Sequence, residues 1–168
     1  MKVLISAASR HGSTDQIAQA IADILVSAGF ETDVRPPDEV TTTAPYDGVV
    51  IGSAVYIGHW LEPAKKLIER ESATLAYKPV WLFSSGPTGE QTTPIEETAE
   101  LVRLRGTAHA IDHRVFAGRL DRGQLGIAER AMVAMVHAPV GDFRVWEDIR
   151  AWSQSIAQTL ETTLAEKV

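Results

Sequence analysis

The stretch KVLISAASRHGST, residues 2–14, decides the fold of this chain. Residues 2–8 form an apolar run, which is typical of a strand buried on both faces of a sheet. A loop of small hydroxyl residues around Gly12 follows, and apolar residues at helical spacing then predict a helix over residues 13–28. The chain therefore opens with a strand, a small polar loop and a helix in direct succession.

The composition narrows the class of protein. The chain has 168 residues, of which 45% are hydrophobic, so we expect a single domain over residues 1–168 with a sizeable core. Cysteine is absent, which excludes disulfides, thiolate metal sites and a cysteine nucleophile and fits a cytoplasmic protein. The net charge of −6 argues against nucleic acid as a partner. The apolar N-terminus fits a buried strand better than a signal peptide.

Strand-like and helix-like segments alternate along the whole chain. Strands are expected at residues 2–8, 30–35, 48–52, 80–84 and 113–117, and helices at 13–28, 62–72, 94–104 (with Thr93 as its cap) and from Trp146 to about Leu164. This alternation predicts an α/β fold with a doubly wound five-stranded parallel sheet, order 2-1-3-4-5, and helices on both faces. Ligands of such folds bind beyond the carboxyl ends of the strands, so the loops after these ends should form one site.

The first of these loops has the chemistry of a phosphate site. A helix N-terminus presents unpaired N–H groups, and Ser9, Ser13 and Thr14 add hydroxyl groups while Gly12 permits close approach. Arg10 and His11 either add positive charge or point into solvent. The loop has neither a G-x-G-x-x-G fingerprint nor the lysine of a P-loop, whereas flavin mononucleotide (FMN) fits it well.

The alternative for this loop is a plain strand-to-helix turn. Ser13 and Gln16 form a capping-box pattern at the start of the helix, and such a turn also explains Gly12. It leaves the hydroxyl groups of Ser9 and Thr14 without a role.

Two later loops offer a wall for the flavin ring. The candidate ring contacts are Ser53, Ala54, Val55, Tyr56, Ile57 and Gly58 in the second loop and Ser84, Ser85, Gly86, Pro87, Thr88 and Gly89 in the third. Tyr56 or Trp60 is a candidate to stack on the ring, although Trp60 could instead pack under the following helix. Gly52 or Gly58 is a candidate for a peptide that changes its orientation beside the ring. A simple Gly-Pro turn is the alternative for the third loop.

The S-x-x-G-S-T pattern of residues 9–14 resembles the phosphate loop of flavodoxin-like proteins. Residues 49–60, 113–120 and 141–146 are similar to the flavodoxin-domain branch that includes the menaquinone-dependent protoporphyrinogen oxidases. The resemblance implies FMN as cofactor, held at its phosphate by Ser9, His11, Gly12, Ser13 and Thr14 and at its ring by residues 53–58 and 84–89. The third loop lacks the aromatic residue that stacks on the flavin in many electron-carrying flavodoxins.

Residues 119–144 form a longer connection than a simple crossover between the last strand and the last helix requires, which predicts an inserted helical segment. An apolar helix is expected at residues 127–137, which either packs on the sheet or offers a surface to a quinone, a porphyrin or a second subunit. The arginines near this segment could attract a carboxylate-bearing substrate or an anionic membrane surface, or could simply be solvated; they are Arg114, Arg119, Arg122 and Arg130. The histidines show no compact spacing for a metal site.

Three functions remain open at this stage. The first is an FMN-dependent oxidoreductase, quinone-linked or porphyrinogen-oxidising, in which the cofactor performs the chemistry and no catalytic acid–base pair is assigned. The second is a flavodoxin-type electron-transfer module that serves a redox partner protein and has no substrate of its own. The third is an interaction domain that has kept the fold without flavin. Peripheral membrane contact and a homo-oligomer are compatible with each of them.

Overall fold

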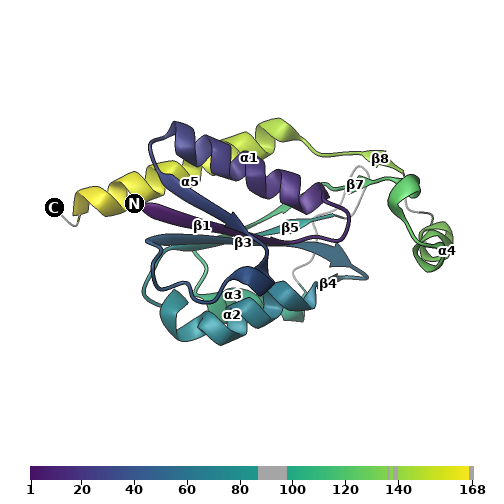
Figure 1. The fold of residues 1–168 in the computed structure, drawn as a ribbon, viewed down its shortest axis with the longest axis horizontal. Coiled ribbons are helices and arrows are strands. Elements are labelled where there is room, and N and C mark those ends of the chain that lie inside the picture. Colours follow the sequence, from purple (N-terminus) through teal and green to yellow (C-terminus); the bar gives the residue numbers. More distant parts are fainter. Residues whose placement is uncertain (87–97, 136, 138–139, 167–168) are drawn as a thin grey trace.

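A parallel sheet forms the centre of the computed structural model, which describes residues 1–86, 98–135, 137 and 140–166 (Figure 1). Its strand order is β2-β1-β3-β5-β6, and all four neighbouring pairs are parallel. The strands are β1 (Lys2–Ala8), β2 (Glu31–Arg35), β3 (Gly48–Tyr56), β5 (Val80–Ser85) and β6 (Asp112–Phe116). The predicted order 2-1-3-4-5 is therefore confirmed.

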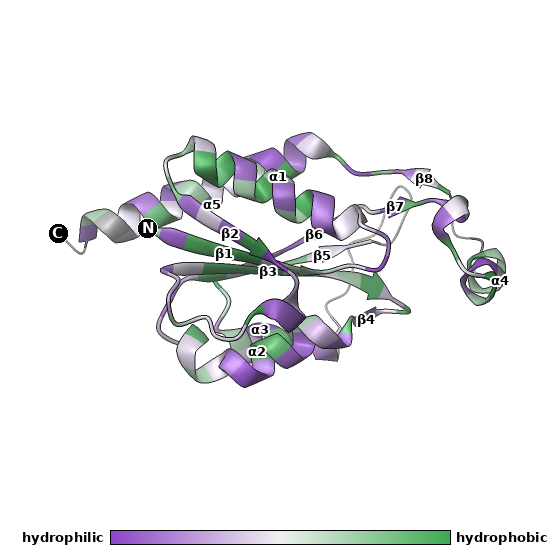
Figure 2. Cartoon of the chain, in the orientation of Figure 1, coloured by the Kyte–Doolittle hydropathy of each residue, from purple (hydrophilic) through white to green (hydrophobic). Residues whose placement is uncertain are grey.

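Helices cover both faces of the sheet, as predicted. In Figure 1, α1 (Ser13–Ser27) and α5 (Trp146–Glu166) lie on one face, and α2 (Glu62–Leu75) and α3 (Ala99–Ala108) lie on the other. Alternate residues of β1 face opposite sides, so Val3 and Ile5 pack with α1 and α5 while Leu4 packs with α2 and α3. This double burial explains why the first strand is apolar at nearly every position (Figure 2).

The third helix differs from its predicted bounds. Thr98 has an extended backbone, and its Oγ1 accepts a hydrogen bond of 3.2 Å from the backbone N–H of Leu101. Thr98 is thus the N-cap of α3, which runs to Ala108 rather than ending at residue 104. The expected cap Thr93 lies outside the described residues.

The inserted segment extends beyond the ends of the central strands. A short antiparallel pair, β7 (Arg119–Leu120) and β8 (Gly141–Asp142), encloses the 3₁₀ turn η2 (Arg122–Gln124) and helix α4 (Ile127–Met135). In Figure 1, α4 projects from the end of the molecule opposite the C-terminus, and it has no buried residues. The interpretation that this helix packs on the sheet is therefore wrong, because the β7–β8 pair carries it past the strands.

A buried carboxylate anchors the chain between β2 and β3. Glu71 of α2 accepts hydrogen bonds from the backbone N–H of Thr43 (2.6 Å), the Thr43 hydroxyl (3.0 Å) and the Thr42 hydroxyl (3.2 Å). Burial by itself raises the pKa of Glu71, but these hydrogen bonds outweigh burial and lower the pKa below its ordinary value. The ionised form of Glu71 therefore stabilises the folded state.

We expect Glu71→Gln to lower the free energy of unfolding at neutral pH by about 2 kcal/mol, since it removes charge-assisted hydrogen bonds. A carboxyl group with a lowered folded-state pKa stabilises the fold above its unfolded value of 4.5 and loses this effect as the pH falls through the folded value. Urea unfolding at neutral pH and at steps below 4.5 should show the two proteins converging in acid. A constant difference would contradict this prediction.

Gly52 lies in β3 against the ring of Phe83. A Cβ at this position would stand 2.1–2.6 Å from three ring atoms of Phe83, which is fully buried and cannot move aside. Gly52→Ala should therefore destabilise the protein by about 3 kcal/mol in urea unfolding. Gly106→Ala is the control, because a Cβ there meets nothing within 4 Å and a helical alanine should add up to about 1 kcal/mol. A neutral Gly52→Ala would refute the packing argument.

Candidate cofactor site

A cavity of about 180 Å³ lies at the carboxyl ends of the central strands. The strand register brings these ends level, because Ala8 pairs with Ser53 and Ser85 pairs with both Ala54 and Phe116. Ten of the predicted site residues line the cavity, namely Ser9, Arg10, His11, Ser13, Thr14, Ala54, Val55, Tyr56, Ser85 and Gly86. The three predicted loops thus meet at one place.

The first loop is shaped by Gly12 and Ser9. Gly12 is the N-cap of α1 with a φ of 80°, in the left-handed region that favours glycine, and its carbonyl accepts from the N–H of Gln16 (3.1 Å). The Ser9 hydroxyl accepts from the N–H of Gly12 (3.0 Å). The capping-box prediction is therefore wrong: Ser13 is the first helical residue, and the Gln16 side chain instead accepts from Arg144 Nη1 (2.6 Å).

Two hydroxyl groups at the start of α1 remain candidates for a ligand. The Oγ of Ser13 is buried and has no hydrogen-bond partner in the described part of the chain, although the residue lines the cavity. Thr14 also lines the cavity and is 1% exposed. A buried polar atom without a hydrogen-bond partner lowers the stability of the fold. An unpaired hydroxyl at a helix N-terminus therefore favours a ligand that accepts its hydrogen bond.

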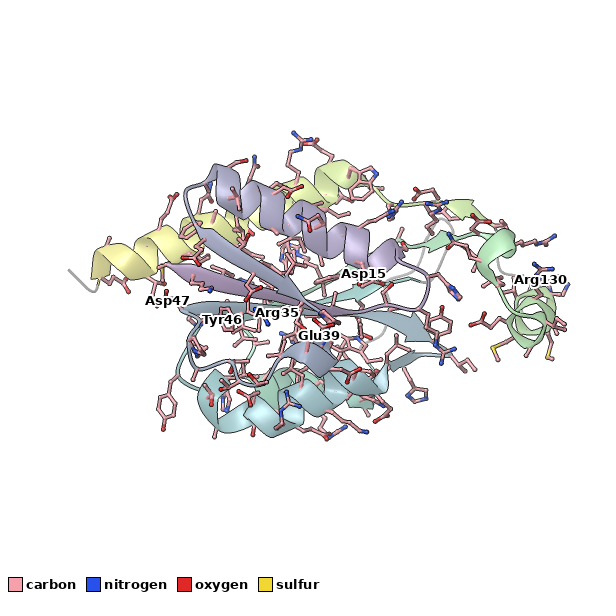
Figure 3. The ribbon with its side chains drawn as sticks, in the orientation of Figure 1. Asp15, Arg35, Glu39, Tyr46, Asp47 and Arg130 are labelled. Atoms are coloured by element: carbon pink, nitrogen blue, oxygen red, sulfur yellow. The ribbon has the colours of Figure 1, made fainter. Side chains whose placement is uncertain are left out.

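Asp15 adds a carboxyl group to the first turn of α1 (Figure 3). Partial burial raises the pKa of Asp15, and a hydrogen bond from Ser9 partly offsets this. Ser9 therefore has two neighbours, Gly12 and Asp15, and its main task is to hold the shape of the loop.

Arg10 and His11 both contact the inserted segment. Arg10 Nη1 lies 3.5 Å from Glu129 Oε1, and His11 Nε2 lies 3.3 Å from the same oxygen. The Arg10 guanidinium also lies 4.5 Å from the centroid of the Tyr56 ring. These side chains are thus held at the cavity by α4 and by the second loop.

The second loop is the end of β3 followed by a tight turn. Ile57 (φ 50°) and Gly58 (φ 76°) join Tyr56 to His59 of β4 (His59–Trp60), as in a two-residue hairpin turn. Neither turn residue is in the cavity lining, and Ile57 is 76% exposed. Gly52 lies between β1 and β5 in a fully paired strand, so its peptide cannot reorient. That interpretation of Gly52 is wrong, and Gly58 is the candidate that remains.

Three residues of the predicted loops have structural partners instead. Trp60 is 5% exposed, and its Nε1 donates to the Ser84 hydroxyl (2.8 Å), which also lies 2.9 Å from His113 Nε2. The Ser53 hydroxyl donates to the carbonyl of Ala54 and accepts from the N–H of Leu61 (2.9 Å). The stacking role suggested for Trp60 is therefore wrong, because its indole is part of the core.

The third loop is described only as far as Gly86, so the predicted contacts Pro87, Thr88 and Gly89 lie outside the described residues. The lining also contains residues of the inserted segment and the turn before it. Arg119 and the helix that holds Val133 were singled out from the sequence, whereas sequence reasoning missed Gly118, Leu120, Asp121 and Leu125. Their position in the chain could have predicted them, because residues that follow the last central strand lie at the same edge of the sheet as the three loops.

The family model of the flavodoxin domain matches residues 4–144, so the chain belongs to the flavodoxin domain family. The cofactor of that family is FMN, which confirms the cofactor predicted from the sequence. The chain is 24% identical over 172 residues to the protoporphyrinogen IX dehydrogenase [quinone] of Escherichia coli (strain K12), covering 94% of this chain and 95% of the relative. This match supports the branch that the sequence resembles.

Solved flavodoxin structures share the fold. A flavodoxin from the domain Archaea superposes with a TM-score of 0.65 at 15% identity, covering 96% of this chain and 99% of that one. Two-electron reduced flavodoxin of Megasphaera elsdenii gives a TM-score of 0.57 at 19% identity, covering 68% of this chain and 85% of that one. Within the described residues, no helix combines the length and apolarity needed to cross a membrane.

Ile57 permits a test of strain at the rim of the site. A β-branched residue in the left-handed region is unfavourable by about 1 kcal/mol, and asparagine tolerates this conformation. We expect Ile57→Asn to raise the free energy of unfolding by about 1 kcal/mol, measured in urea. Val34→Asn, at another partly exposed apolar position but in β2, should not stabilise the protein. Equal effects of the two substitutions would exclude backbone strain as the cause.

Proposed function

We propose that this chain is an FMN-dependent oxidoreductase that exchanges electrons with a small molecule of the quinone or porphyrinogen class. The observation that carries the FMN site is the cavity at the strand ends, whose lining includes Ser13 with its buried, unpaired hydroxyl. The substrate class is suggested by the name of the Escherichia coli relative. The lack of cysteine fits action in the cytoplasm.

The residues present fit the two halves of FMN. We assign the phosphate to the first turn of α1, where the free backbone N–H groups and the hydroxyls of Ser13 and Thr14 can donate to it. A Cβ at Gly12 would meet nothing within 4 Å, so glycine is favoured there by its φ of 80° rather than by crowding. Tyr56 and Val55 provide a flat apolar wall for the ring.

The protein's part in the reaction is to bind, orient and exclude water. FMN, when bound, supplies one- or two-electron transfer at its ring. Tyr56, Ser85 and Gly86 line the cavity together with Leu125 and Val133 of the inserted segment, whose apolar side chains would exclude water from a bound ring. Asp121 is committed to Arg119 and to the N–H of Gly123.

An electron-transfer module is the second candidate, and the exposed surface of α4 favours it. Ile127 is 90% exposed and Met135 is 77% exposed, which suits contact with a protein partner. The same surface is compatible with a second copy of the chain or with peripheral contact to a membrane.

Ser13→Ala tests the phosphate assignment. We expect the flavin-free variant to be as stable as the wild type or slightly more so, because an unsatisfied hydroxyl is removed. Its FMN affinity should fall roughly tenfold through loss of one charge-assisted hydrogen bond, whereas riboflavin, which has no phosphate, should bind unchanged. Absorption and fluorescence titrations measure both affinities.

Ser6→Ala is the matched control, since Ser6 Oγ is also buried and unpartnered but does not line the cavity. It should gain the same stability without any change in FMN affinity. Equal FMN affinities of the two variants would refute the role of Ser13, and a wild-type protein that binds no FMN would overturn the proposed function. Quinone-dependent oxidation of protoporphyrinogen by the FMN-loaded protein then separates the enzyme from the electron-transfer module.

A further inference from the structure

Arg10 occupies an unusual position at the cavity. Its backbone belongs to the first loop, but its guanidinium lies 4.5 Å from the centroid of the Tyr56 ring, which belongs to the second loop. Both residues line the cavity. The positive charge of Arg10 is therefore on the aromatic wall rather than among the hydroxyl groups of the first turn of α1.

Glu129 of α4 places a carboxylate beside Arg10. Its Oε1 faces Arg10 Nη1 (3.5 Å) and His11 Nε2 (3.3 Å), and its Oε2 accepts from the N–H of Gly126 (2.9 Å). The hydrogen bond from Gly126, with smaller contributions from His11 and Arg10, lowers the pKa of Glu129, so this carboxylate is negative at neutral pH. Glu129 is not in the cavity lining, whereas Arg10 is.

Among the described lining residues, the second arginine already has a carboxylate partner. Arg119 lies 3.4 Å from Asp121, and both belong to the short segment after β6. Arg10 and Glu129 differ from this pair, because the positive residue Arg10 lines the cavity and the negative residue Glu129 does not. Arg10 therefore favours a negative charge on a bound ligand, and Glu129 disfavours it.

We propose that Arg10 is a positioning residue that stabilises negative charge on the reduced flavin ring, and that the carboxylate of Glu129 moderates this effect. The proposal rests on the proposed function. Two electrons and one proton added to the neutral ring system leave it with one negative charge. Arg10 therefore raises the midpoint potential of bound FMN, and Glu129 lowers it.

Single substitutions distinguish this electrostatic role from a structural one. Arg10→Gln should lower the two-electron midpoint potential by about 30 mV, which is a tenfold loss of preference for the reduced form. Glu129→Gln should raise it by a similar amount, and the double variant should lie near the wild type. A structural role would move both single variants in the same direction, because each breaks the same ion pair.

The potentials are measured by dithionite titration of the FMN-loaded protein against a reference dye. Arg10→Lys keeps the charge and should retain most of the potential. Arg150→Gln is the control, since it removes an exposed arginine of α5 that is not in the cavity lining. Repeating the set with His11→Gln removes the neighbouring imidazole from the comparison.

Shifts in the same direction, or none in either single variant, would overturn the proposal. A further result against it is that Arg10→Gln weakens FMN but not riboflavin, because Arg10 would then be a phosphate ligand. These failures differ from failure of the proposed function, in which wild-type protein binds no FMN. Thermal unfolding of each flavin-free variant checks that the substitutions, at side chains that are 51% and 26% exposed, leave the fold intact.

Discussion

Parallel pairing of β1 with both of its neighbours is the constraint on which the site depends. Parallel strands all end at the same edge of a sheet, so the loops after β1, β3, β5 and β6 must meet there. Loops separated by dozens of residues in the chain therefore enclose one cavity. The apolar β1, covered on both faces, has no alternative place outside the centre of the sheet.

In the first loop, some residues set the backbone conformation and others line the cavity. The N–H of Gly12 donates to the Ser9 hydroxyl, and this hydrogen bond stabilises the turn. Ser13 and Thr14, which follow it, line the cavity. Arg144 stabilises the same region from behind: its side chain is 3% exposed and donates to the Gln16 side chain. The buried guanidinium of Arg144 and the left-handed backbone conformation of Gly12 thus stabilise the N-terminus of α1 beside the cavity.

The inserted segment links the cavity to the outer surface of the molecule. Val133 of α4 lines the cavity and Glu129 contacts Arg10 and His11, while Ile127 and Met135 are exposed. Helix α4 has no buried residue, and its Glu129 carboxylate contacts Arg10 and His11 of the first loop. This arrangement makes the charge of the site and the position of α4 depend on the same side chains.

The order of the sheet, the helices on both faces and the first loops that line the cavity could all be predicted from the sequence, because hydrophobic periodicity and turn residues are local signals. Helix ends were less predictable, since Gly12 and Thr98 became caps through backbone geometry rather than through residue type alone. Only the tertiary structure decided that Trp60 is a core residue and that α4 stands away from the sheet. Both outcomes depend on contacts between residues far apart in the chain, such as Trp60 with Ser84 and Arg10 with Glu129, which no local pattern encodes.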